Sequence, residues 1–160
     1  MDEHSSSNSN FKIVNSLKGK LPDILADRPV NLAYLYGSIV DGRALPSSDA
    51  DMALVLESNC SLSAYERMRL EFDIAAEVES RCHINKADVR SINEAPLTVQ
   101  GMVVTEGVLL YSRDEEFRVE FEVYTRKLYF DFLPVQEMMR HSFFENVQKE
   151  GFLSGKTRQS

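Results

Sequence analysis

The segment Tyr36-Gly37-Ser38-Ile39-Val40-Asp41-Gly42-Arg43-Ala44-Leu45-Pro46-Ser47-Ser48-Asp49-Ala50-Asp51-Met52 joins two apolar runs of the chain. The run before it, 32–36, predicts a strand that ends at a Gly-Ser turn, and the run after it predicts a second strand. Side chains alternate between the two faces of a strand, so Asp49 and Asp51 are expected to project from the same side.

Two carboxylates held a few ångströms apart repel each other unless a cation lies between them. Mg²⁺ suits such a pair, because it binds one or two carboxylates and completes its shell with water and phosphate oxygens. The turn at Gly37 and Ser38 supplies backbone N–H groups and a hydroxyl at the end of a strand, where a phosphate can be held. Together these features indicate phosphoryl or nucleotidyl transfer.

The bulk composition indicates one soluble globular domain of 160 residues and 18.2 kDa. No apolar stretch is long enough to span a bilayer, so no membrane partner is expected. We expect a disordered tail over 1–10, which lacks a signal peptide, a folded domain over 11–152 that includes the C-terminal helices, and a frayed tail over 153–160. Cys60 and Cys82 form no disulfide framework, and we expect a cytoplasmic protein.

The net charge of −7 bears on the partners of the chain. Proteins that grip a nucleic-acid backbone usually carry a basic excess, because neutralising phosphates supplies most of that affinity. Direct binding of a long DNA or RNA is therefore not expected, whereas a small nucleotide chelated by a metal ion remains compatible with this charge.

Hydrophobic periodicity predicts the remaining elements. Pro134 is expected to kink or split the last helix. We predict strands at 31–36, 49–57, 85–92 and 108–111, a helical turn at 38–43, a loop at 45–48, and helices at 11–27, 63–81 (capped by Ser61 or Ser63), 97–106 and 114–148.

A third carboxylate, Asp88, lies on the predicted strand 85–92, which one helix separates from the second strand. If the two strands pair, Asp88 can face Asp49 and Asp51. Three carboxylates on neighbouring strands, opposite a Gly-Ser turn, suit chemistry with two metal ions that stabilise the entering and leaving oxygens.

On these residues, and on Ile92-Asn93-Glu94-Ala95-Pro96 and Glu106-Gly107-Val108-Leu109-Leu110-Tyr111, the chain resembles the minimal nucleotidyltransferases (MNT) of the polymerase-β superfamily. The resemblance spans about 32–129 and is greatest to the MNT antitoxins of HEPN/MNT toxin–antitoxin pairs. It implies an α/β (α+β) fold with a small mixed sheet backed by helices and a long C-terminal helical segment.

The same resemblance implies ATP as the donor, Mg²⁺ as the cofactor, and transfer of AMP to a tyrosine of a cognate HEPN ribonuclease, which would be silenced in a hetero-oligomer. Carried over, Gly37 and Ser38 would hold the triphosphate, and Asp49 and Asp51 the metal ions. Asp88 would complete the metal site and help to deprotonate the attacking hydroxyl.

One departure concerns the turn. Many relatives carry Gly-Ser-x-Ala-Arg-Gly, with a cation beside the phosphates, whereas this chain has Asp41 at the corresponding arginine position. An inward-pointing acid would repel a triphosphate. Either Arg43 takes over the cationic role from two positions along, or Asp41 points to solvent.

Two other functions remain open at this stage. One is nucleotidyl transfer to a small hydroxylated molecule. Enzymes of that kind usually carry an added substrate domain, and 160 residues leave little room for one. The other is a non-catalytic antitoxin that neutralises its toxin by binding, which Asp41 favours and the three carboxylates oppose. The predicted last helix carries more aromatic residues, including Tyr129, Phe130 and Phe143, than one packed stripe requires, which is typical of a partner interface.

Overall fold

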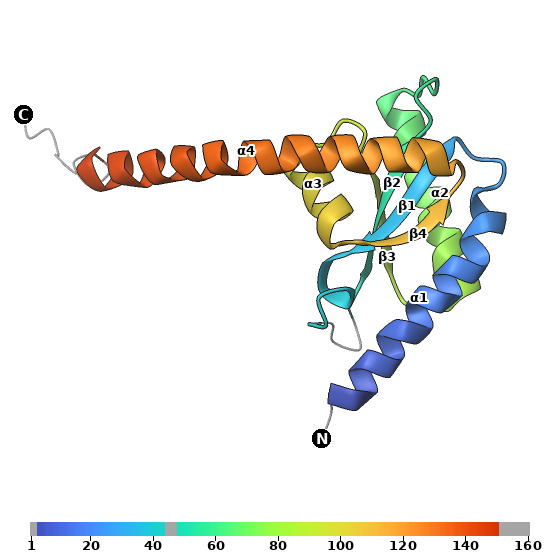
Figure 1. The fold of residues 1–160 in the computed structure, drawn as a ribbon. Coiled ribbons are helices and arrows are strands. Elements are labelled where there is room, and N and C mark those ends of the chain that lie inside the picture. The colour runs from blue at the N-terminus through green and yellow to red at the C-terminus, as the bar shows by residue number, and fades with distance from the viewer. Residues whose placement is uncertain (1–2, 44–47, 151–160) are drawn as a thin grey trace, which may run out of the picture.

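The computed structural model describes residues 3–43 and 48–150. It contains a four-stranded sheet with the order β3-β2-β1-β4, packed between helices (Figure 1). The elements are α1 (Glu3–Leu25), β1 (Val30–Tyr36), the 3-10 turn η1 (Gly37–Ile39), β2 (Ala50–Leu56), α2 (Ala64–Cys82), β3 (Ala87–Ser91), α3 (Leu97–Glu106), β4 (Val108–Ser112) and α4 (Glu115–Glu150). Most of the predicted loop 45–48 and the predicted tail 153–160 lie outside the described residues.

The sheet is mixed, as predicted. β1 is antiparallel to both β2 and β4, whereas β2 and β3 run parallel. Parallel strands require a crossover connection, and α2 supplies it between β2 and β3. This crossover brings the strand of Asp88 beside the strand of Asp51, which the spacing of the sequence only suggested.

Each face of the sheet buries its own apolar cluster. Leu21 of α1, Ile74 of α2 and Met52 of β2 belong to the cluster on one face. Val103 of α3 belongs to the cluster on the other face, against which Phe117 and Phe121 of α4 pack. The strands therefore present one set of alternate residues to α1 and α2, and the other set to α3 and α4.

Local signals account for the ends of several helices. Ser63 and Glu66 form a capping box at the start of α2, so of the two predicted caps Ser63 is the one used. The carboxylate of Asp114 accepts hydrogen bonds from the N–H groups of Glu116 and Phe117 at the start of α4.

One predicted feature at the N-terminus was wrong. α1 begins at Glu3 rather than at residue 11, so residues 3–10 are helical and not a disordered tail. Asn10 of that segment donates a hydrogen bond to the Ile39 carbonyl (3.0 Å), which gives the added turns a tertiary contact with η1.

α4 runs through Pro134 as one helix, so of the kink or split that we expected, the split does not occur. Pro134 lies on an exposed part of α4, where water can bond the carbonyl that lacks its intrahelical donor. The second half of α4 projects beyond the body of the protein (Figure 1). In the described part of the chain, no helix is long and apolar enough to cross a membrane.

Candidate active site

The three predicted aspartates lie together at one end of the sheet. In the strand register Asp51 pairs with Asp88 on β3 and with Tyr36 on β1, so the three residues form one row across the sheet. Asp49 directly precedes β2 and, two residues from Asp51, projects toward the same face. The register therefore places Asp51 beside Asp88 on neighbouring strands, and the role of the three aspartates as a metal site stays a prediction.

Gly37 brings the Gly-Ser turn into direct contact with this row. Its φ is +78°, a conformation that glycine adopts at little cost. A Cβ atom at this position would lie 2.6 Å from Oδ2 of Asp51, closer than carbon and oxygen can approach without repulsion. Both features require glycine, and they place the Asp51 carboxylate against the turn that was predicted to hold phosphates.

Two of the three carboxylates have a cationic partner on the same face. Lys86 Nζ lies 2.7 Å from Asp49 Oδ2, and Arg90 Nε lies 2.9 Å from Asp88 Oδ1. Within residues 3–43 and 48–150, no three His, Cys, Asp or Glu side chains are gathered closely enough to form a metal-binding group. Lys86 and Arg90 thus compensate part of the acidic charge in this conformation.

The surroundings of Asp51 disfavour the ionised form of its carboxyl group. Burial raises the pKa of the Asp51 carboxyl, the carboxylates of Asp88 and Asp49 raise it further, and Lys86 acts in the opposite direction. Burial, followed by Asp51 and Asp88, likewise raises the pKa of the Tyr36 hydroxyl. Burial is the larger cause of both shifts and the neighbouring carboxylates add to it, and the oxygen-rich donor set suits a hard divalent cation.

Two glutamates of α2 hold the strand that carries Asp88. Glu79 accepts a hydrogen bond from the Ala87 N–H (2.8 Å), and Glu71 accepts one from the Ser91 N–H (2.7 Å). β3 is an edge strand, so these N–H groups have no further strand to bond. The two side chains fix β3 on either side of Asp88 and thereby position its carboxylate.

The predicted cation of the turn is engaged locally. Arg43 forms an ion pair with Asp41, and its side chain is 79% exposed. Ser38 accepts a hydrogen bond from the Arg43 N–H through its carbonyl oxygen (3.1 Å). The charge of Asp41 is therefore compensated. Arg43 is paired with Asp41 and not with Asp49, Asp51 or Asp88. The nucleotide-binding role of Gly37, Ser38 and Arg43 stays a prediction.

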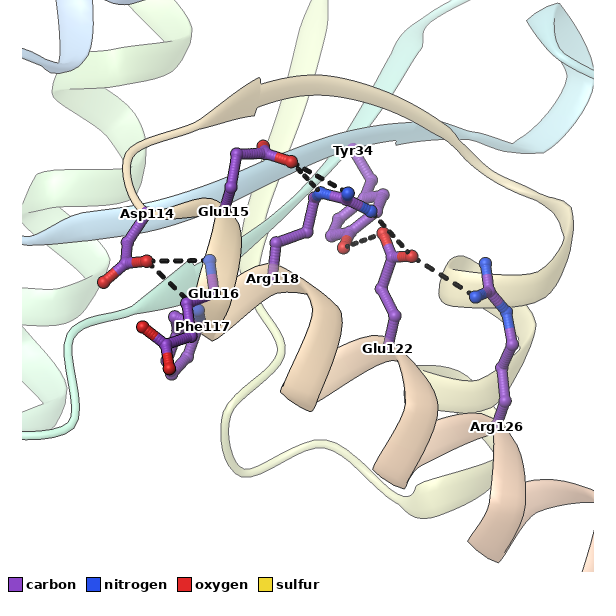
Figure 2. A network of polar contacts seen from close by, with 8 residues as sticks. All are labelled: Tyr34, Asp114, Glu115, Glu116, Phe117, Arg118, Glu122 and Arg126. Carbon is purple, nitrogen blue, oxygen red and sulfur yellow. Dashed lines mark hydrogen bonds and ion pairs between the residues drawn. The ribbon is translucent and has the colours of Figure 1, made fainter.

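A second polar cluster on the same face was not predicted (Figure 2). The Tyr34 hydroxyl donates to Glu122 Oε1 (3.0 Å), and Glu122 Oε2 is paired with Arg118 (3.1 Å) and Arg126 (3.2 Å). Arg126 also donates to the Val104 carbonyl of α3. Burial and Glu122 hold the pKa of Tyr34 well above its ordinary value. This cluster joins β1, α3 and α4, and it begins two residues before Tyr36 on β1.

The sequence model of the family described as "Polymerase beta, Nucleotidyltransferase" matches residues 19–116, which include all three aspartates and the Gly-Ser turn. The chain belongs to this nucleotidyltransferase family.

Solved structures of toxin–antitoxin proteins share the fold. One, a toxin–antitoxin crystallised with AMP-PNP, is 23% identical, with a TM-score of 0.59 over 82% of this chain and 98% of that one. Another, in a complex of a tri-AMPylated Shewanella oneidensis HEPN toxin with MNT antitoxin, is 21% identical, with a TM-score of 0.56 over 84% and 98% of the two chains. A MntA–HepT toxin–antitoxin structure is 22% identical, with a TM-score of 0.55 over 82% and 97%. No curated protein matches the chain.

Proposed function

We propose that this chain is an Mg²⁺-dependent nucleotidyltransferase antitoxin that transfers AMP from ATP to a tyrosine hydroxyl of a cognate HEPN toxin. The observation that carries the proposal is the row formed by Tyr36, Asp51 and Asp88, with Asp51 pressed against Gly37. Family membership supports nucleotidyl transfer, and the fold shared with toxin–antitoxin proteins supports the acceptor. Transfer from ATP fits the expected cytoplasmic location.

Asp49, Asp51 and Asp88 would hold the magnesium ions, which supply positive charge against the phosphates. The turn at Gly37 and Ser38 would hold the triphosphate. In the transfer, the acceptor oxygen bonds to the α-phosphorus while the bond from that phosphorus to pyrophosphate breaks. Asp88 takes the proton of the acceptor hydroxyl. Its side chain is 47% exposed, so an acceptor from outside can reach it.

The projecting half of α4 is the surface on which we place the toxin. Phe117 and Phe121 lie near the start of α4 and pack against the sheet. The same face of the helix continues into the projecting half through Val135, Met139 and Phe143. The last three side chains are 40%, 63% and 63% exposed. A solvent-exposed apolar stripe of this kind is typical of a helix that docks on a partner.

The experiment is an intact-mass measurement of a candidate HEPN toxin, after incubation with this chain, Mg²⁺ and ATP. We expect the HEPN protein to gain one or more AMP units, and no gain when the Asp49/Asp51 double alanine variant is used. A parallel incubation with hydroxylated small molecules tests the alternative acceptor. If the HEPN protein stays unmodified while this chain transfers AMP to one of the small molecules, the proposed acceptor is contradicted.

The exposed face of α4 also favours a second function, in which the chain neutralises its toxin by occlusion alone. Toxin activity in the presence of the Asp49/Asp51 double variant separates the two functions. Full neutralisation by the double variant supports occlusion, whereas restored toxin activity supports modification.

A further inference from the structure

β3 presents an alternating pattern of charge to the face of the site. Lys86 directly precedes the strand, and Lys86, Asp88 and Arg90 project to the same side because they are spaced two residues apart. The Ala50 N–H donates to the Lys86 carbonyl (2.9 Å), and Ala50 is the register partner of Ala87, so the preceding residues Asp49 and Lys86 lie opposite each other. The Lys86–Asp49 ion pair is therefore fixed by strand register.

The Gly-Ser turn itself contributes no net positive charge toward a triphosphate. Asp41 and Arg43 compensate each other, and residues 44–47 contain no Lys or Arg. A protein cation that contacts the phosphate chain beside the metal ions would therefore have to come from another element. Lys86 is placed to supply one, because it lies on the same face as Asp51 and its side chain is 67% exposed.

We propose that Lys86 is an exchangeable cation: it pairs with Asp49 in the unliganded protein and binds the phosphate chain of the nucleotide once Asp49 is ligated to a divalent ion. This inference rests on the proposed function and names a substrate-binding residue for it.

The exchange is physically easy because both partners are accessible. Asp49 is 39% exposed and Lys86 67% exposed, and ion pairs of this kind in water are weak. A lysine also carries its charge on a flexible four-carbon stem, so it can turn from a carboxylate to a phosphate without movement of the backbone. Lys86 would thus compete with the metal ion for Asp49 but strengthen the binding of the nucleotide.

This dual role predicts effects of opposite sign on two ligands. Mn²⁺ binding without nucleotide is measured by electron paramagnetic resonance, and binding of Mg²⁺ with a non-hydrolysable ATP analogue is measured by calorimetry. In Lys86→Gln we expect Mn²⁺ to bind about threefold more tightly, because a weak competing ion pair is lost. We expect the analogue to bind about tenfold more weakly, because a charge-assisted hydrogen bond is lost.

Lys127→Gln is the matched control, because it removes the same charge from an exposed position on α4. It should bind both ligands as the wild type does, and Lys86→Arg should retain most of the affinity for the analogue. Unchanged binding of both ligands by Lys86→Gln, or weakening of both, would overturn the exchange alone. A wild-type chain that binds neither ligand would overturn the proposed function and the exchange with it.

Discussion

Two polar clusters occupy neighbouring rows of the same face of the sheet, and they differ in how completely the protein satisfies them. Tyr34 bonds to a buried glutamate whose charge two arginines balance. Two residues along β1, Tyr36 adjoins Asp51 and Asp88, where burial and mutual repulsion raise the pKa of Asp51. The first cluster is complete within the chain, which is typical of structural polar groups, whereas in the second Lys86 and Arg90 are paired with Asp49 and Asp88 and Asp51 has no such partner among the described residues.

The largest expected effect separates the two clusters by activity. Asp51→Asn removes a carboxylate from the incomplete cluster, and we expect AMP transfer to fall by about a thousandfold, because positioning and charge stabilisation are lost together. Transfer is measured with labelled ATP and the HEPN acceptor. The variant should fold normally, since one source of repulsion is gone. Wild-type transfer by Asp51→Asn would remove Asp51 from the active site.

The next effect separates them by stability. Glu122→Ala leaves the Tyr34 hydroxyl without its acceptor and two arginines without their shared carboxylate, so we expect the free energy of unfolding to fall by about 3 kcal/mol. Urea denaturation measures this change. Glu120→Ala, an exposed position of the same helix, is the control and should change stability little. If both variants unfold at the wild-type midpoint, the Tyr34 cluster does not secure α4.

The smallest effect is a dependence on pH. Because the folded protein raises the pKa of Asp51, ionising this carboxyl disfavours the folded state. The penalty is present above the raised pKa and is lost below the ordinary pKa of an aspartate. Asp51→Asn should therefore be slightly more stable than wild type near neutral pH, and the difference should vanish in acid. Thermal unfolding of both proteins across this range measures it, and a difference that grows in acid would contradict the assignment.

Local signals allowed much of the fold to be predicted. The periodic apolar residues and the Ser63 cap located α2, and the alternation around Asp88 located β3 and the side chains that share a face with Asp88 on that strand. These features depend on neighbours in sequence, which determine helix ends and strand faces directly.

The remaining features depend on contacts between distant residues. Tyr34 and Glu122 are 88 positions apart, and no local pattern pairs them. Lys86 and Asp49 meet only because β2 and β3 run parallel in one register. The alternation of Lys86, Asp88 and Arg90 was visible in the sequence and is the signal that could have indicated cations on the face of the site.

The glutamates that bond the outer N–H groups of β3 have a consequence for how molecules meet this protein. An exposed strand edge normally invites a strand of another chain to extend the sheet, but Glu71 and Glu79 already occupy hydrogen-bond donors on that border. Pairing between the β3 edges of two copies of the chain is therefore disfavoured. If a polypeptide is the acceptor, as proposed, we expect it to reach Asp88 from the exposed face of the sheet rather than by pairing with the edge of β3.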